Sequence, residues 1–368
     1  MEGNSLADKN PFDLSSNYNL KGCYVEILSN CNLRCLHCYN ESGTTNEIMP
    51  LSAFKRAIDS IPSNDPESDI TISGGEPLLH PDIWKFIEEV DKKNVGKSLV
   101  ITNATLIDRD VAKRFATSKI GIQVSLNGSC AEVHDQLCGK GSFDRTIHGL
   151  ENLLAEGLQE DIHVRFTLAD FNKDDVKNFT KLMLSYGIET ISIADLSISG
   201  RASDNLKSLG FSTHEKEQVK NRIAKQIQGF DTEKILIRFD NKNYTNGCPV
   251  IYESDKLIPM NFRVDAFGYV YICQAFTDEL YSVGNIYRST LSEILASREF
   301  SEFIWFCRYV TKYIPECRNC IWKSTCGQGC IANVLSSQDR ISPDGDCYFR
   351  RKDYLKKFME EHYSKIVQ

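Results

Sequence analysis

The 368-residue sequence has no hydrophobic run long enough to cross a membrane, which takes about 18 or more consecutive apolar residues. Its first segment, Met1 to Asn10, is polar and lacks the apolar stretch of a secretory signal peptide. These two absences predict a cytoplasmic protein without a membrane-spanning helix.

The sequence also lacks an excess of positive charge, because 43 Lys and Arg face 50 Asp and Glu, giving a net charge of −7. Proteins that coat nucleic acid or bind anionic membrane surfaces usually carry a basic excess. We therefore expect neither nucleic acid nor a membrane among its partners. The hydrophobic content of 41% is ordinary for a globular chain with a buried core.

Cysteine, in contrast, is abundant, with 14 residues. In a reducing compartment such a number indicates metal binding or catalysis rather than disulfides. Cys31, Cys35 and Cys38 form the pattern C-x3-C-x2-C. Thiolates select zinc or iron–sulfur clusters, and structural zinc usually takes four protein ligands. Three close thiolates suit a [4Fe–4S] cluster with one open iron; a zinc site that borrows His37 or a distant cysteine is the alternative.

The cysteine triplet follows a predicted strand at 22–28, and a second predicted strand at 69–73 ends in Gly74-Gly75-Glu76-Pro77. On these residues the sequence resembles the radical S-adenosylmethionine (SAM) enzymes. The resemblance implies that the three cysteines hold a [4Fe–4S] cluster and that SAM chelates its fourth iron. It also implies that the Gly74-Gly75-Glu76 turn contacts the amino group of SAM.

Residues 21–205 alternate short β-branched runs with amphipathic segments, which predicts a parallel sheet covered by helices. The predicted strands are 22–28, 69–73, 97–102, 120–126, 162–168 and 189–195, and the predicted helices are 51–60, 81–93, 107–118, 143–156 and 173–186. Six such units fall short of a full (β/α)8 barrel. The resemblance implies an α/β fold, a partial (β/α)6 barrel with its cofactor residues at the carboxyl ends of the strands.

Three further positions near strand ends match features of the family. By resemblance, Asn103 hydrogen-bonds SAM, Ser125 contacts its ribose or carboxylate, and Gly200 begins a Gly-Arg-Ala segment common in relatives. Ordinary turn and cap chemistry is the alternative for each.

Cys138 stands where relatives commonly have an arginine, which removes an anion contact. A thiol there can donate a hydrogen atom to a radical, but a small buried side chain is the simpler interpretation.

From 230 onward the pattern changes to hairpins and cysteines. Residues 262–273 predict a β-hairpin that turns at Phe267-Gly268, and 349–366 predict a charged helix. The cysteines here are Cys248, Cys273, the C-x2-C-x5-C-x3-C run Cys317, Cys320, Cys326 and Cys330, and Cys347. They resemble the SPASM extension of radical SAM enzymes, which holds two auxiliary [4Fe–4S] clusters. We therefore predict a lead-in at 1–20, a barrel at 21–205, a bridging helix and linker at 206–235, and a SPASM domain at 236–368.

The resemblance implies two ligand sets in this domain, and so three [4Fe–4S] clusters in the chain. Cys317, Cys320, Cys326 and Cys347 would hold the second auxiliary cluster, whereas Cys248, Cys273 and Cys330 would hold the first. No cysteine lies between 249 and 272 to complete the first set. We predict an open or exogenously filled iron there, with Cys307 as an alternative ligand. A zinc-binding domain is the alternative for the whole region.

By resemblance, reductive cleavage of SAM gives a 5′-deoxyadenosyl radical that abstracts hydrogen from the substrate. Relatives with two auxiliary clusters mostly modify peptides, so we expect a maturase of a ribosomally made peptide that forms a thioether or carbon–carbon crosslink. The expected partners are a precursor peptide or protein and a reductant such as flavodoxin or ferredoxin. Residues 1–20 are too short for a peptide-recognition domain, so a separate recognition protein or direct leader binding is also needed.

Three other functions stay open. A small-molecule dehydrogenase or epimerase acting on a sugar, cyclitol or amino acid derivative is the main alternative. A sulfatase-maturing, formylglycine-generating enzyme is less favoured, because Gln274 stands where those enzymes place an aspartate base. An electron-transfer protein would not need the SAM turn. Tyr39, Arg165 and Asp195 lie near predicted strand or cluster ends, but packing explains each equally well, so the catalytic base is unassigned.

Overall fold

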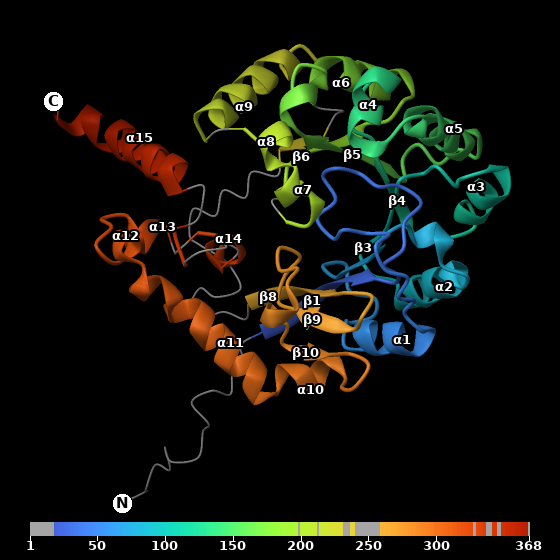
Figure 1. Cartoon of the computed structure of the whole chain (residues 1–368), viewed down its shortest axis with the longest axis horizontal. Helices are drawn as coiled ribbons and strands as arrows, with labels where there is room; N and C mark the ends of the chain where they lie inside the picture. Colours follow the sequence, from blue (N-terminus) through green and yellow to red (C-terminus); the bar gives the residue numbers. More distant parts are fainter. Residues whose placement is uncertain are drawn as a thin grey trace, which may run out of the picture. The chain divides into compact units, whose positions relative to one another are not determined.

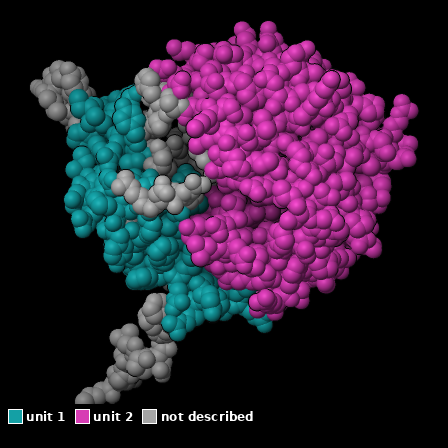
Figure 2. Space-filling view, viewed as in Figure 1, with its two compact units in different colours: residues 1–19, 242–260, 292–368 teal, residues 20–241, 261–291 magenta. Residues whose placement is uncertain are grey.

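The computed structural model describes residues 18–197, 199–211, 213–230, 236–239, 258–326, 329–335, 341–343 and 347–366. The chain divides into two compact units, which are coloured separately in Figure 2. The unit here called the first, magenta and labelled unit 2 in Figure 2, comprises residues 20–241 and 261–291. The unit here called the second, teal and labelled unit 1, comprises residues 292–368 with the segments 1–19 and 242–260. Each unit is described below by itself.

Ten strands form one sheet in the order β10-β9-β8-β1-β2-β3-β4-β5-β6-β7. They are β1 (Tyr18–Glu26), β2 (Asp69–Ser73), β3 (Lys97–Thr102), β4 (Gly121–Ser125), β5 (Ile162–Leu168), β6 (Thr190–Asp195), β7 (Leu236–Phe239), β8 (Ile258–Val264), β9 (Tyr269–Tyr271) and β10 (Gly284–Asn285). Strands β1 to β7 pair in parallel, in sequence order. The six predicted strands are therefore confirmed, with β1 beginning and ending earlier than predicted; the sequence analysis missed β7.

Helices follow the parallel strands, and most of them lie on the outer side of the sheet (Figure 1). They are α1 (Leu51–Asp59), α2 (Ile83–Lys93), α3 (Arg109–Phe115), α4 (Ala131–Cys138), α5 (Ser142–Ala155), α6 (Val176–Ser185), α7 (Arg201–Asp204), α8 (Leu206–Leu209) and α9 (Thr213–Ile227). The five predicted helices between the strands are confirmed. The bridging helix predicted within 206–235 is confirmed as α9. The short helix α4 was not predicted.

Strand β5 shows why the sheet has an apolar outer face and a more polar inner one. Ile162, Val164, Phe166 and Leu168 alternate with half-buried polar residues. Phe166 packs against Phe179 of α6 with ring centroids 4.8 Å apart, so the apolar set faces the helices. Because side chains alternate across a strand, Arg165 and its polar neighbours face the inside of the partial barrel. That inside is suited to polar ligands.

The antiparallel hairpin β8–β9 confirms the turn predicted at Phe267-Gly268. Gly268 has a φ of +84°, a left-handed conformation that glycine adopts without strain. The Asp265 carboxylate accepts hydrogen bonds from the backbone N–H groups of Phe267 and Tyr269, at 3.0 and 2.9 Å. These bonds fix the turn that precedes Cys273.

The second unit contains helices that carry or flank its cysteines. They are α11 (Arg298–Tyr309), α12 (Pro315–Arg318), α13 (Lys323–Cys326), α14 (Ile331–Leu335) and α15 (Cys347–Ile366); α10 (Leu291–Leu295) begins at its border. Helix α15 confirms the predicted charged helix and extends it to Cys347. Among the described residues, no helix is both long and apolar enough to cross a membrane.

A buried ion pair joins β1 to the hairpin strand β8 within the first unit. The Arg263 guanidinium donates two hydrogen bonds of 2.9 Å to the Glu26 carboxylate, and both side chains are almost fully buried. Arg263 also donates to the carbonyl of Phe276 at 2.7 Å and to Asn40 Oδ1 at 3.0 Å. The side chain of Asn40 in turn donates to Glu26 at 2.6 Å. The pair therefore links β1, β8 and the segment after Cys38.

We expect Arg263→Met to lower the free energy of unfolding by about 3–5 kcal/mol, because it leaves the Glu26 carboxylate buried without its partner. Anaerobic denaturant titration measures the change. Arg298→Met is the matched control, since Arg298 pairs with Glu302 on the surface with 81% of its side chain exposed. That control should change the stability by less than about 1 kcal/mol. Equal losses in both variants would contradict a special contribution from the buried pair.

Candidate active site

The segment 27–43, here called the cysteine loop, follows β1 and carries Cys31, Cys35 and Cys38. Backbone hydrogen bonds tie its first part to the turn after β2. Gly75 N–H donates to the carbonyl of Leu28 at 2.8 Å, and Glu76 N–H donates to the carbonyl of Asn30 at 2.9 Å. The Gly-Gly-Glu turn and the first cysteine are therefore held together by main-chain contacts, at the carboxyl ends of neighbouring strands.

Two glycines allow the chain to approach the cysteine loop closely. A Cβ atom on Gly75 would lie 1.9 Å from the carbonyl oxygen of Asn30. A Cβ atom on Gly200, after β6, would lie 2.7 Å from the carbonyl oxygen of Cys38 and 2.5 Å from that of Tyr39. No side chain fits at either position, so both glycines are required by the loop they touch.

Two arginines hold the carbonyl groups of the cysteine loop. Arg201 Nε donates to the carbonyl of Cys35 at 2.9 Å, and its Nη1 donates to that of Ser42 at 3.1 Å. Arg34 reaches across the loop, donating from Nη1 to the carbonyl of Leu33 at 2.9 Å and from Nη2 to that of Gly43 at 2.6 Å. The sequence analysis assigned no role to either arginine; the Gly-Arg-Ala match at 200–202 was the available signal for Arg201.

The three thiols of the loop suit a cluster with three protein ligands. Backbone N–H groups of Leu33 and Ser42 donate to the sulfurs of Cys31 and Cys38, each at 3.4 Å. Burial raises the pKa of Cys31 to about 12, and the charges of Cys35 and Cys38 act in the same direction. The Cys31 thiol is thus neutral until a metal displaces its proton. N–H donors aimed at sulfur are the arrangement that stabilises bound thiolates.

Glu76 is fully buried and is held by three donors of its own chain. Thr102 Oγ1 donates to its carboxylate at 2.7 Å, and the N–H groups of Asn103 and Leu78 donate at 2.8 and 3.2 Å. Burial raises the pKa of Glu76 to about 7, although these donors act in the opposite direction. The side chain therefore joins the ends of β2 and β3 and positions the Gly-Gly-Glu turn.

Asn103 lies beside the cysteine loop, as its predicted role requires. Its Nδ2 donates to Asn32 Oδ1 at 2.9 Å and lies 3.9 Å from Cys31 Sγ, and its Oδ1 accepts from Thr105. Ser125 is the last residue of β4, half-buried and paired in register with Arg165 of β5. Contact of Asn103 and Ser125 with SAM stays a prediction.

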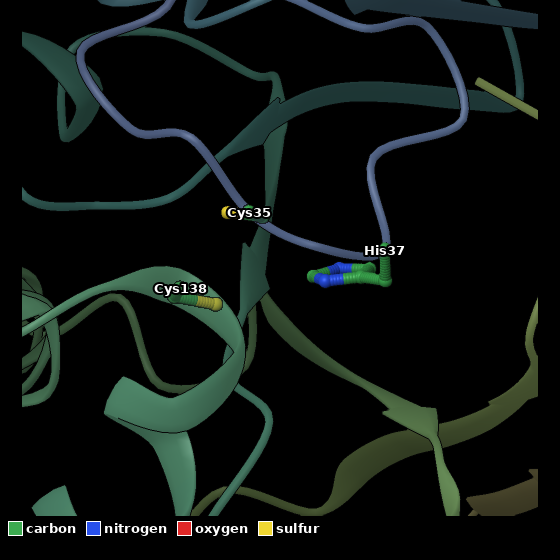
Figure 3. Close-up of side chains that lie close together, drawn as sticks. All are labelled: Cys35, His37 and Cys138. Carbon is green, nitrogen blue, oxygen red and sulfur yellow. The ribbon is translucent and has the colours of Figure 1, made fainter. Parts of the chain in front are cut away.

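An apolar cluster supports the cysteine loop from the side of α4. Its buried members are Leu33, Leu137, Cys138, Ala169 and Leu209, and Cys31 and Cys35 pack against it. Leu36 N–H also donates to the carbonyl of Leu137 at 2.9 Å. The donor atoms of Cys35, His37 and Cys138 lie within 4.8 Å of one another (Figure 3). Cys138, with 4% exposure, is therefore a buried neighbour of the loop and not a thiol open to solvent.

In the second unit, the structure brings together the four cysteines predicted to hold the second auxiliary cluster. Burial raises the pKa of Cys317 to about 11, and the nearby thiols of Cys347, Cys326 and Cys320 raise it further. The guanidinium of Arg351 on α15 lies beside the same thiols and hydrogen-bonds to Cys320. Neighbouring thiols with a cation beside them suit a negatively charged cluster, and binding of the second auxiliary cluster by these four cysteines stays a prediction.

The other predicted ligands are less fully placed. Cys273 follows β9 and is half-buried, and Cys330 precedes α14 and is also half-buried. Cys248 lies outside the described residues. Cys307 is fully buried in α11 near Phe300 and Ile304, so it occupies a core position. The ligand set of the first auxiliary cluster stays a prediction.

Two of the side chains left without a role make structural contacts. The hydroxyl of Tyr39 donates to Glu26 at 3.2 Å and hydrogen-bonds to the hydroxyl of Tyr24 at 2.8 Å. Asp195 pairs with Lys220 of α9 at 2.7 Å. Both residues therefore belong to the scaffold around the site.

Comparison with known families gives two matches. The family model of the Radical SAM superfamily matches residues 25–183, and the SPASM model, an iron–sulfur cluster-binding domain, matches residues 259–321. The first covers the cysteine loop and the Gly-Gly-Glu turn, and the second covers the hairpin, Cys273, Cys317 and Cys320.

Several curated proteins are similar over most of this chain. Mycofactocin maturase MftC of Mycobacterium tuberculosis is 26% identical over 338 residues, covering 88% of this chain and 81% of that protein. The antilisterial bacteriocin subtilosin biosynthesis protein AlbA of Bacillus subtilis is 28% identical over 327 residues, covering 85% and 67%. Fe-coproporphyrin III synthase of Methanosarcina barkeri is 27% identical over 358 residues, covering 88% and 86%.

A solved structure shares the fold. Streptococcus suis SuiB, bound to its precursor peptide SuiA, superimposes with a TM-score of 0.71 at 16% identity, covering 94% of this chain and 83% of that one. At this identity the likeness shows the fold alone, and it confirms the α/β partial barrel followed by a cysteine-rich domain.

We expect Gly75→Ala to prevent assembly of the cluster in the cysteine loop, because the new Cβ would overlap the carbonyl of Asn30. Iron per chain after anaerobic reconstitution should fall by about four atoms, the content of one [4Fe–4S] cluster. Gly229→Ala is the control, since nothing lies within 4 Å of a Cβ there. Unchanged iron in Gly75→Ala would show that the close approach is not needed.

Proposed function

Because the chain belongs to the radical SAM superfamily and carries a SPASM iron–sulfur domain, we propose that it is a maturase that oxidatively crosslinks a ribosomally made precursor peptide. The observation that carries the proposal is similarity across both domains, over 88% of this chain, to a protein named as the mycofactocin maturase. A second such relative is named for the biosynthesis of the bacteriocin subtilosin.

In such an enzyme the cluster and bound SAM supply a 5′-deoxyadenosyl radical that removes hydrogen from carbon. The residues of this chain bind and orient. Cys31, Cys35 and Cys38 would hold the cluster, and the Gly74-Gly75-Glu76 turn, Asn103 and Ser125 would bind SAM beside it. The half-buried polar side chains of β5, such as Arg165, face the inside of the barrel, where a polar ligand needs them. Apolar packing around Cys138 keeps water from the base of the loop.

The crosslink we propose is a thioether or a carbon–carbon bond. Either product requires an acceptor for the electron left on the substrate after hydrogen is removed. Cys317, Cys320, Cys326 and Cys347 in the second unit, and Cys248, Cys273 and Cys330, provide two places for auxiliary clusters that suit this need. A cytoplasmic flavodoxin or ferredoxin would supply the reducing electron, and a separate recognition protein or direct leader binding would deliver the peptide.

A small-molecule reaction is the second candidate, because Fe-coproporphyrin III synthase is as similar in identity and coverage as the maturase. A sulfatase-maturing reaction is less favoured, because Gln274 has no carboxylate to accept a proton. The substrate therefore has to be decided by experiment.

We expect anaerobic reconstitution to give about twelve irons per chain, the content of three [4Fe–4S] clusters, and the enzyme to cleave SAM when reduced. Changing Cys31, Cys35 and Cys38 together to alanine should remove about four irons and all cleavage, because no other residue replaces three thiolates. Iron and sulfide analysis and release of 5′-deoxyadenosine measure these effects. Bound zinc, or cleavage that survives the triple change, would overturn the assignment.

We expect a precursor peptide encoded beside the gene to lose the mass of the hydrogen atoms removed when it is incubated with reduced enzyme and SAM. High-resolution mass spectrometry with fragmentation locates the crosslink. The triple cysteine variant is the control for damage by the reductant. Cleavage of SAM with an unchanged peptide, together with conversion of a porphyrin or sugar substrate, would reject the maturase in favour of the second candidate.

A further inference from the structure

Cys138 places its sulfur close to one of the three cysteines of the loop. It is the last residue of α4, and its side chain is buried. Its Sγ lies within 4.8 Å of Cys35 Sγ. Figure 3 shows the two side chains and His37 gathered where the cysteine loop passes α4. Cys138 has no place among the three cluster ligands, so this contact is not explained by cluster binding.

Asn127, which is buried beside Cys138, decides which way a hydrogen bond between the two sulfurs can run once Cys35 is a ligand thiolate. Its Oδ1 accepts from the backbone N–H of Thr167 at 2.7 Å, and this contact identifies the oxygen end of the amide. The Nδ2 end therefore faces Cys138 Sγ, at 3.5 Å. An amide nitrogen only donates, so the sulfur of Cys138 is the acceptor there. The single S–H proton of Cys138 remains available for Cys35.

The backbone around Asn127 holds this amide in place. Its N–H donates to Nδ1 of His134 at 3.0 Å, and its carbonyl accepts from Asn172 Nδ2 at 3.2 Å. Asn127 is 1% exposed and Asn172 is fully buried. A chain of donors therefore runs from a fixed amide, through the Cys138 thiol, to the Cys35 sulfur.

We propose that Cys138 is a positioning residue that donates an S–H hydrogen bond to the Cys35 thiolate and raises the reduction potential of the cluster held by the loop. Reduction adds negative charge to the cluster and its sulfurs, so a donor to a ligand sulfur stabilises the reduced form more than the oxidised form. The inference rests on cluster binding by Cys35 but does not depend on the peptide substrate.

The test is a redox titration of the holoenzyme followed by electron paramagnetic resonance. The loop cluster is identified as the signal that the Cys31, Cys35 and Cys38 triple variant lacks. In Cys138→Ala we expect the equilibrium constant for reduction to fall about tenfold, which lowers the midpoint potential by about 59 mV for one electron. In Cys138→Ser we expect the potential to stay at or above that of the wild type, because the hydroxyl is also a donor.

Cys130→Ala is the matched control, since it removes a thiol at the other end of the same helix, where Cys130 contacts Glu132. Its potential should equal that of the wild type. An unchanged or higher potential in Cys138→Ala would overturn the proposal, as would a fall in Cys138→Ser. Should Cys138→Ala fail to load its cluster, the serine variant alone decides. Cluster-free wild type that retains a zinc ion, together with loss of that zinc in Cys138→Ala, would assign Cys35, His37 and Cys138 to a mononuclear metal site (Figure 3). That result would also overturn the proposal.

Discussion

The buried pairing of Arg263 with Glu26 is the interaction on which the arrangement of the first unit depends. A guanidinium and a carboxylate inside a protein are tolerated only when each meets the other in good geometry and the remaining donors find acceptors. Here the acceptors are the Phe276 carbonyl and Asn40. Because Asn40 follows Cys38 closely and Phe276 follows Cys273 closely, one arginine positions the segments after two predicted cluster ligands. A lysine could not replace it, since it lacks the planar fork of donors.

The cysteine loop is held mainly by contacts with its backbone. Gly75 and Gly200 approach its carbonyls from different strand ends, and Arg201 and Arg34 donate to other carbonyls of the same loop. This arrangement leaves the three thiols free for metal while their positions are fixed. A site that binds a cluster needs such preorganisation, because thiolates that repel one another would separate without the metal.

The two departures from the expected pattern have different consequences. Gln274 removes a carboxylate next to a predicted auxiliary ligand, which bears on the reaction that follows hydrogen abstraction. Cys138 stands where the family resemblance leads us to expect an arginine, and this small neutral side chain is buried in the cluster against which Cys35 packs. Neither change touches a predicted cluster ligand, so both concern how the predicted site is tuned.

The sequence by itself determined the six parallel strands, their intervening helices and the cysteine pattern. Local periodicity and ligand spacing are properties of short segments, and a family resemblance rests on the same residues. The sequence analysis did not predict strand β7, because its four residues carry too little periodic signal. It did not predict helix α4 for the same reason, since that helix has only eight residues. Only the tertiary structure decided that Glu76 is engaged by Thr102 and Asn103, that Arg201 holds the Cys35 carbonyl, and that Cys138 meets Cys35. Each of these contacts joins residues far apart in sequence, and nothing in the spacing of the chain specifies which side chains the closing of a sheet will bring together.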